Sequence, residues 1–141
     1  MNAAQKNEKL ARNIQTRTGV WVGLQDAATL RRAQLTLHRW DEAECGDSNE
    51  RGSWCIVRDE ETGKPYREVH PNRGQSYRTP INDLEAGALR RIVEVCERNG
   101  LHYYHQGDCR GCSLYVHNEP LNDGGQNQPG VTYTHGVACV V

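Results

Sequence analysis

The sequence predicts an α+β domain in which a mainly antiparallel sheet of about four to six strands carries two amphipathic helices on one face. Two segments repeat apolar residues at helical spacing, a hairpin-like segment stands between them, and three strand-like segments follow. Short turns between consecutive strands favour antiparallel pairing. The 141 residues are expected to form a single domain, 1–141, with one hydrophobic core.

The composition narrows the possible functions. Hydrophobic residues make up 36% of the chain, Phe is absent, and the formal net charge is −1, so the overall field favours neither nucleic acid nor a basic partner. No run approaches the ~20 apolar residues of a membrane span, and "MNAAQKNEKLARN" lacks the apolar core of a secretory signal. We therefore expect a cytoplasmic protein with no membrane partner. Its six cysteines should stay reduced and act mostly as small buried hydrophobes.

The first third of the chain contains one predicted helix. Residues 1–17 are polar and charged, which predicts a loose N-terminal arm or a weak helix, and Val20–Leu24 is the first apolar anchor. A helix is predicted over Asp26–Cys45, with Asp26 as its N-cap. The residues expected to face the core recur at helical spacing: Leu30, Ala33, Leu37 and Trp40.

The middle of the chain predicts a hairpin, a loop and a second helix. Ser53–His70 alternates as two strands do, with a turn at Glu61–Gly63, and Pro71–Pro80 is expected to be a polar loop. The helix over Asn82–Gly100 begins with a capping box, Asn82 with Glu85, and ends at a glycine. Its predicted buried stripe is Leu84, Ala88, Ile92 and Val95 or Cys96.

Three strands are predicted in the last third: Leu101–Gln106, Cys112–Asn118 and Val131–Val141. Asp108–Gly111 would turn between the first two, and 119–130 is expected to be a flexible loop. The sheet face away from the helices would be partly open and would carry Tyr, His and Arg side chains.

The stretch "HYYHQGDCRGC" contains candidate metal ligands, namely His102, His105, Cys109 and Cys112. Zinc modules usually separate their ligand pairs by a longer loop, and in a strand His102 and His105 point to opposite faces. We therefore expect no cofactor, with zinc as the alternative, and leave open a pairing of Cys109 and Cys112 with Cys45 and Cys55. The C-x-x-C spacing also occurs in redox motifs, but the strand-to-helix context of thioredoxins is missing.

The polar corner of the same stretch is the stronger candidate for binding. Arg110 offers a planar fork for carboxylates or phosphates, and Asp108 can orient it. Gln106, His105 and Tyr104 precede the corner on the predicted strand. The competing interpretation is a plain structural turn, since turns favour Asp and Gly for conformational reasons.

A second stripe lies on the first predicted helix, where Gln34, His38, Glu42 and Cys45 follow one another at helical spacing. His38 and Glu42 could form an acid/base pair, although such stripes are more often solvated flanks. They are weak catalytic candidates. Whether they lie near the Asp108–Arg110 turn is left open. Arginines on both helices alternate with acidic residues, which favours surface ion pairs over a continuous basic track.

Four segments in this order carry a resemblance: "TLRRAQLTLHRWDEAECGDSN", "RDEETGKPY", "DLEAGALRRI" and "DCRGCSLYV". Across about residues 26–117 the chain resembles a group of small uncharacterised proteins of tailed bacteriophages and prophages, most specifically in LRRxxLTLHRWxExECG. The resemblance implies the bacterial cytoplasm of the host as the compartment, and a product outside the large structural set of the virion. Chains of this pattern often carry Pro in the place of Cys109, which weakens a site that depends on Cys109.

These observations predict a non-enzymatic accessory protein of phage or prophage type that binds a host or phage protein. The alternative is a protein that binds or acts on nucleic acid or nucleotides through the Asp108–Arg110 corner, and a third possibility is a zinc-stabilised module. Tyr, Trp and Arg are the side chains that usually anchor protein interfaces. A homo-oligomer formed through an exposed strand is also compatible with the sequence.

Overall fold

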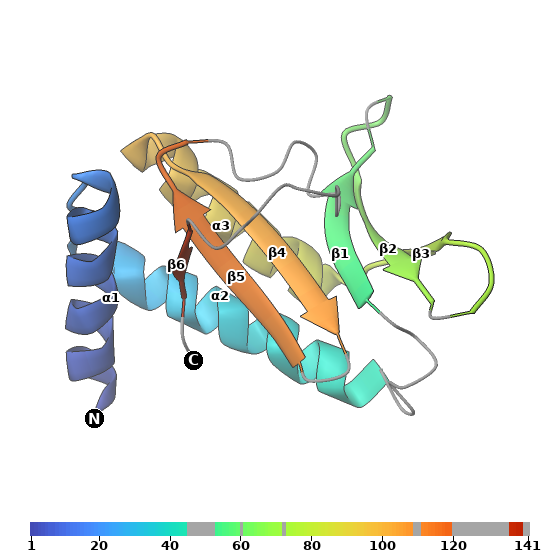
Figure 1. Ribbon diagram of the computed structural model, residues 1–141, viewed down its shortest axis with the longest axis horizontal. Coiled ribbons are helices and arrows are strands. Elements are labelled where there is room, and N and C mark those ends of the chain that lie inside the picture. The colour runs from blue at the N-terminus through green and yellow to red at the C-terminus, as the bar shows by residue number, and fades with distance from the viewer. Residues whose placement is uncertain (45–52, 60, 72, 109–110, 120–135, 140–141) are drawn as a thin grey trace.

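The computed structural model describes residues 1–44, 53–59, 61–71, 73–108, 111–119 and 136–139 (Figure 1). Side chains are described for most of these, but not for 39–44, 53, 55, 57–58, 106–108 and 111–112. The class is α+β, as predicted. The elements in chain order are α1 (Ala3–Thr18), α2 (Gly23–Glu44), β1 (Ser53–Arg58), β2 (Pro65–His70), β3 (Tyr77–Pro80), α3 (Asp83–Asn99), β4 (His102–Asp108), β5 (Gly111–His117) and β6 (Val137–Ala138).

The strands follow the order β3-β2-β1-β4-β5-β6, and every neighbouring pair is antiparallel. The half of the sheet formed by β1–β3 joins the half formed by β4–β6 through β1 and β4. These two strands share one register pair, Trp54 with Gly107. The six strands form one antiparallel sheet, within the predicted four to six, and its two three-stranded halves are small and meet along β1 and β4.

Helices α2 and α3 lie together behind β4 and β5, as Figure 1 shows. The core between these layers is continuous and includes Leu30 and Ile92 from the helices and Leu114 and Val116 from β5. The predicted core positions Leu30, Ala33 and Leu37 are fully buried, whereas the side chain of Trp40 lies outside the described residues. The two predicted helices thus cover one face, as expected.

Helix α2 begins earlier than predicted. Its first residue is Gly23, and Asp26 lies within the first turn rather than at the N-cap. The Asp26 carboxylate instead accepts hydrogen bonds from Arg98 Nη2 (2.8 Å) and Asn99 Nδ2 (2.9 Å) at the end of α3. Asp26 therefore joins the start of α2 to the end of α3.

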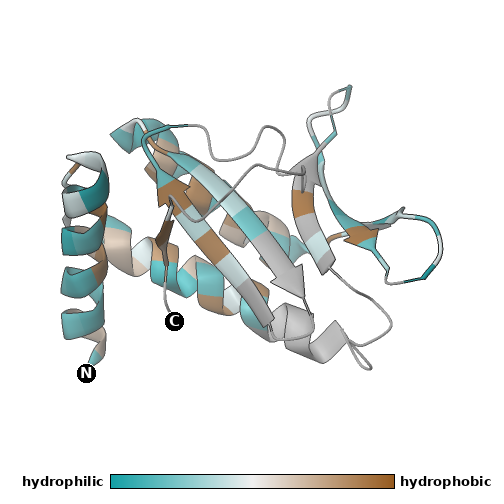
Figure 2. Cartoon of the chain, viewed as in Figure 1, coloured by the Kyte–Doolittle hydropathy of each residue, from teal (hydrophilic) through white to brown (hydrophobic). Residues whose placement is uncertain are grey.

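Of the two predictions for residues 1–17, a loose arm or a weak helix, the structure shows a helix, α1. It begins at a capping box in which the Asn2 side chain and the Gln5 backbone are 2.9 Å apart, and it ends at Gly19, whose φ of 77° suits a glycine. Leu10, Ala11 and Ile14 are buried on its inner side. Figure 2 shows the opposite, outer side of α1 as hydrophilic. Burial of three apolar residues fixes a segment that composition alone suggested would be loose.

The first hairpin has the predicted strands, β1 and β2. The Asp59 carboxylate caps the turn by accepting hydrogen bonds from the backbone of Glu61 (2.8 Å) and Thr62 (2.9 Å), and Gly63 takes a φ of 69°. The predicted loop over 71–80 is wrong at its end, where β3 forms. This strand pairs with β2, and Arg78 lies over the Tyr66 ring at 4.2 Å, a contact that polar composition did not reveal.

Helix α3 has the predicted capping box and the predicted C-terminal glycine, since Asn82 Oδ1 accepts from the Glu85 backbone at 2.7 Å and Gly100 has a φ of 68°. One predicted core residue is wrong: Leu84 is 70% exposed. The inward position is taken instead by Glu85, which is fully buried. The rest of the predicted stripe is buried, namely Ala88, Ile92, Val95 and Cys96.

The reason for this exchange is an ion pair between Glu85 and Arg67. The Arg67 guanidinium on β2 contacts Glu85 Oε2, and both side chains are buried. Because β1 touches β4 at one register pair, this contact is a main link between the β1–β3 half of the sheet and α3. A charge-assisted, buried contact of this kind also fixes the inward rotation of the first turn of α3.

The predicted last strand, Val131–Val141, lies mostly outside the described residues. Of the range Val131–Val141, the structure describes 136–139, and within it only Val137–Ala138 form a strand, paired with β5. Helix α1 lies beside β6 (Figure 1), so that this edge of the sheet is covered by a helix. At the opposite edge, β3 is four residues long and carries Arg78 and Pro80, which discourage pairing with another chain.

We expect Glu85→Ala to lower the free energy of unfolding by about 3–5 kcal/mol, because the charge of Arg67 would remain buried without its partner. The double variant Arg67→Met/Glu85→Leu should lose much less, since no charge is then left inside. Urea unfolding of both variants measures the two values. Glu8→Gln, which removes an exposed pair with Arg12, is the control and should change stability by less than about 1 kcal/mol. Equal losses in the single and double variants would contradict the coupling.

Candidate binding surface

The predicted polar corner lies at the end of the β4–β5 hairpin. The register runs from His102 opposite His117 at one end to Asp108 opposite Gly111 at the other. Arg110 and Cys109 lie outside the described residues. Gln106, Asp108 and Cys112 are placed by their backbone in β4 and β5, and their side chains lie outside the described part. The structure therefore places the backbone of Asp108 and Gly111, which pair at one end of the hairpin.

Two of the predicted binding residues, Tyr104 and His105, have fully buried side chains. Residues opposite each other in an antiparallel pair point to the same face. His105 is opposite Leu114, which belongs to the core, so it faces the helices; Tyr104 is opposite Tyr115 and lies on the other face. Both residues are thus interior side chains, and the face away from the helices is closed at Tyr104.

The metal candidates are spread along the hairpin. His102 is exposed at the far end of β4, six residues from Asp108, which corresponds to about 20 Å along a strand. His105 is buried on the opposite face about 10 Å from His102 by the same rise. Within the described ranges, no three His, Cys, Asp or Glu side chains gather in a way that could hold a metal ion.

The weak catalytic candidates lie on α2. His38 is half-buried, Gln34 is 2% exposed, and the side chain of Glu42 and all of Cys45 lie outside the described residues. The His38–Glu42 pair therefore stays a prediction. Among the described cysteines, burial raises the pKa of Cys96 to about 12, and burial together with the neighbouring Cys96 raises the pKa of Cys139 further. Both thiols therefore stay protonated at neutral pH and behave as small apolar side chains.

Polar side chains on β2 and β3 already have partners on β2 or in the neighbouring turns. Arg78 Nη1 is 3.4 Å from Asp59 Oδ2, and His70 lies 3.4 Å from Glu68 Oε1 and 2.8 Å from the Ser76 hydroxyl. A ligand that used these groups would have to break contacts that already exist. This surface is consequently a weaker candidate than one whose side chains have no internal role.

The junction between α1 and α2 presents such side chains. Trp21 is 48% exposed and Leu24 is 51% exposed. The local structure explains why: Val20 packs against the core and Val22 is 7% exposed, so in this extended link the side chain between them turns outward. Sequence reasoning treated Val20–Leu24 as an anchor to the core and did not single out Trp21.

The junction is held at both ends by hydrogen bonds. Asn118, just after β5, donates to the Thr18 carbonyl at 3.0 Å, and the Thr18 hydroxyl accepts from the Val20 backbone at 3.1 Å. Gly19 and Gly23 both take positive φ, which lets the chain turn tightly from one helix into the next. Trp21 is therefore displayed from a fixed backbone.

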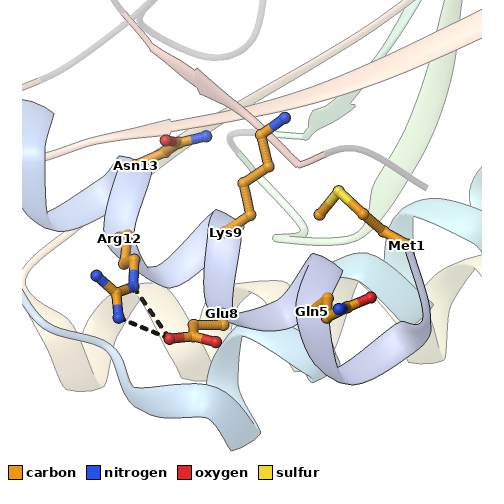
Figure 3. Close-up of a pocket in the computed structure, with 6 residues that line it drawn as sticks. All are labelled: Met1, Gln5, Glu8, Lys9, Arg12 and Asn13. Atoms are coloured by element: carbon orange, nitrogen blue, oxygen red, sulfur yellow. Dashed lines mark hydrogen bonds and ion pairs between the residues drawn. The ribbon is translucent and has the colours of Figure 1, made fainter.

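Helix α1 presents a charged outer face with a shallow, open hollow in its N-terminal part. Figure 3 shows the six lining residues, which are Met1, two residues before α1, and five residues of α1: Gln5, Glu8, Lys9, Arg12 and Asn13. Arg12 Nη2 and Glu8 Oε1 form an ion pair of 2.7 Å on one flank. Lys9 and Asn13 point to the other flank. The hollow is shallow and open, and most of its lining side chains are polar.

Comparison of the chain with protein-family models, with curated proteins and with solved structures finds no match to any of them. Across the described helices, none combines the length and the apolar content that crossing a bilayer requires.

The link between Asp26 and α3 has a testable pH dependence. Burial raises the pKa of Asp26, but hydrogen bonds from Arg98 and Asn99 and the charge of Arg98 outweigh burial, so the pKa lies below its ordinary value. A lowered carboxyl pKa stabilises the fold above the unfolded-state pKa of about 3.9 and loses that contribution as the pH falls through the folded-state value. Asp26→Asn should therefore be less stable than wild type at pH ~7, and the difference should shrink below pH ~4. A difference in unfolding free energy that stays constant with pH would contradict this account.

Proposed function

We propose that the chain is a small non-enzymatic accessory protein of phage or prophage type that binds a host or phage protein. The phage origin is supported by the sequence patterns described above. The observation that carries the binding role is the exposed pair Trp21 and Leu24 at the α1–α2 junction. Trp is the side chain most enriched among residues that dominate protein-interface energies, and an aliphatic neighbour adds apolar contact.

The rigidity of the junction supports this proposal. Trp21 stands between two inward side chains, Val20 and Val22, and between two helices that share the main core. A side chain presented from a fixed backbone loses less conformational freedom on binding than one on a mobile loop, so more of its contact energy appears as affinity.

A nucleic-acid role through the Asp108–Arg110 corner is the alternative. Among the described cations, Arg78 is paired with Asp59 and Arg98 with Asp26, and Lys6 and Lys9, which form no ion pair, lie on α1, away from the Asp108–Gly111 end of the β4–β5 hairpin (Figure 1). Binding to a phosphate backbone relies on free cations and falls steeply with salt. Exposed Leu24 gains little from phosphate, whereas an apolar pocket of a protein covers it. The protein-binding role is therefore better supported.

The proposal is tested by affinity capture from lysates of infected or lysogenic bacterial cells, followed by a binding assay with each captured protein in purified form. A true partner should bind wild type in solution. Trp21→Ala should weaken its affinity at least about thirtyfold, the effect expected of an interface anchor worth about 2 kcal/mol. Leu84→Ala, which truncates an exposed apolar residue on α3, is the matched control and should bind as wild type does.

Two results would overturn the proposal. A capture that nuclease treatment abolishes would assign the protein to nucleic acid instead. A partner whose affinity depends on Arg110 but is unchanged in Trp21→Ala would move the binding surface from the junction to the β4–β5 corner.

A further inference from the structure

The charges of the chain are distributed unevenly. Helix α1 carries four cationic side chains, Lys6, Lys9, Arg12 and Arg17, and one anionic side chain, Glu8, so its formal charge is +3. Because the whole chain carries −1, the remaining residues carry −4. A nearly neutral protein thus has one basic helix, and the hydrophilic side of that helix faces outward (Figure 2).

The cations of α1 form a stripe on one flank. Lys6, Lys9, Asn13 and Arg17 follow one another at spacings of three, four and four, which places them on the same side of a helix. The stripe extends for about 16 Å at 1.5 Å per residue. Arg12 turns toward Glu8 on the other flank (Figure 3). In the described part of the chain, Lys6 and Lys9 form no ion pair.

The stripe leads to the apolar junction. Arg17 lies in the last turn of α1, and Trp21 follows four residues later, after the Gly19 turn that ends the helix. The surface therefore presents cations along α1 and apolar side chains at its C-terminal end. Both parts are fixed, since the inner side of α1 is buried and Arg31 of α2 donates to Asn7 at 2.6 Å.

We infer that the partner contacts this surface with an acidic protein segment that also carries apolar side chains. Its carboxylates lie along Lys6 and Lys9, and its apolar residues cover Trp21 and Leu24. This inference rests on the proposed protein-binding function and adds the chemistry of the partner. Complementary charge speeds the encounter and fixes its register, while burial of the apolar pair supplies most of the affinity.

The probes are two synthetic polymers of similar length, poly-L-glutamate and a random copolymer of Glu and Tyr, titrated against the full chain by fluorescence polarisation. Both should bind at about 50 mM salt and weaken strongly at about 500 mM, where exposed charges are screened. The copolymer should bind more tightly, because its Tyr rings can cover the junction. Trp21→Ala should remove that preference and leave the affinity for poly-L-glutamate unchanged.

A second experiment tests the role of the α1 cations by comparing two double variants with the same change in net charge. Lys6→Glu/Lys9→Glu should weaken the affinity for both polymers at least about tenfold. Arg90→Glu/Arg91→Glu, on exposed positions of α3, should change these affinities by less than about twofold. Far-UV circular dichroism checks that each variant keeps its helices. Equal weakening by the two double variants would overturn the inference, because net charge rather than the α1 stripe would then govern binding.

Other outcomes separate this inference from the function on which it rests. If a duplex DNA oligonucleotide binds more tightly than the copolymer at the same salt, the stripe serves nucleic acid and the inference fails. If a purified partner binds in a manner that needs Trp21 but tolerates Lys6→Glu/Lys9→Glu, the protein-binding function stands and the acidic partner is excluded. If no partner depends on Trp21, the proposed function itself fails, whatever the polymers do.

Discussion

Burial of the inner side of α1 is the constraint on which the binding surface depends. Leu10, Ala11 and Ile14 are buried in the core that α2, α3, β5 and β6 share. A fully buried Leu or Ile side chain contributes about 1.5–3 kcal/mol, whereas an exposed ion pair such as Arg12–Glu8 contributes about 1 kcal/mol or less. The inner stripe therefore decides how α1 sits, and the cations on the outer side follow from that orientation.

The same constraint sets the position of Trp21. Since α1 and α2 are both fixed in one core, the link between them has little freedom, and Val20 and Val22 occupy its inward positions. The exposed Trp is a consequence of this geometry. A surface with an aromatic anchor beside a charged helix thus results from packing on the far side of the same two helices.

The β1–β3 half of the sheet obeys a different constraint. It meets the other half at one register pair and contributes Ile56 to the main core, while Trp54 and Val69 form a small cluster of their own. The buried contact of Arg67 with Glu85 supplements this modest apolar attachment. Glu85 faces inward where the sequence predicted Leu84. A buried carboxylate needs a charged partner, and Arg67 supplies one.

Much of the fold could be predicted from local patterns, because α2, α3 and both hairpins carry strong periodicity, capping residues or turn glycines. Helix α1 was predicted only as a weak helix, in competition with a loose arm, although Asn2, Gln5 and Gly19 are ordinary helix-end signals. Its three buried residues are separated by many polar ones. They stabilise the helix only because they pack against the rest of the domain. Strand β3 was missed because its pairing depends on β2 rather than on its own composition.

The candidate binding surface was harder to predict from the sequence than the fold. The histidines and cysteines of the β4–β5 hairpin drew attention by residue type, yet the structure buries His105 and places His102 at the far end from the corner. The exposure of Trp21 depends on which neighbours turn inward, and that is a property of the assembled core. A capping box at Asn2 read together with Leu10 and Ile14 would have been the signal that located this surface.

The central claim is that α1 is a packed part of the domain, and amide hydrogen exchange tests it most directly. Slow exchange requires both a hydrogen bond and burial in a unit that rarely opens. The account predicts that the amides of Leu10–Ile14 exchange about as slowly as those of Leu30–Leu37 in α2. Exchange of Leu10–Ile14 at the rate of an unstructured peptide, with α2 and α3 still protected, would contradict it and would remove the basis of the binding surface.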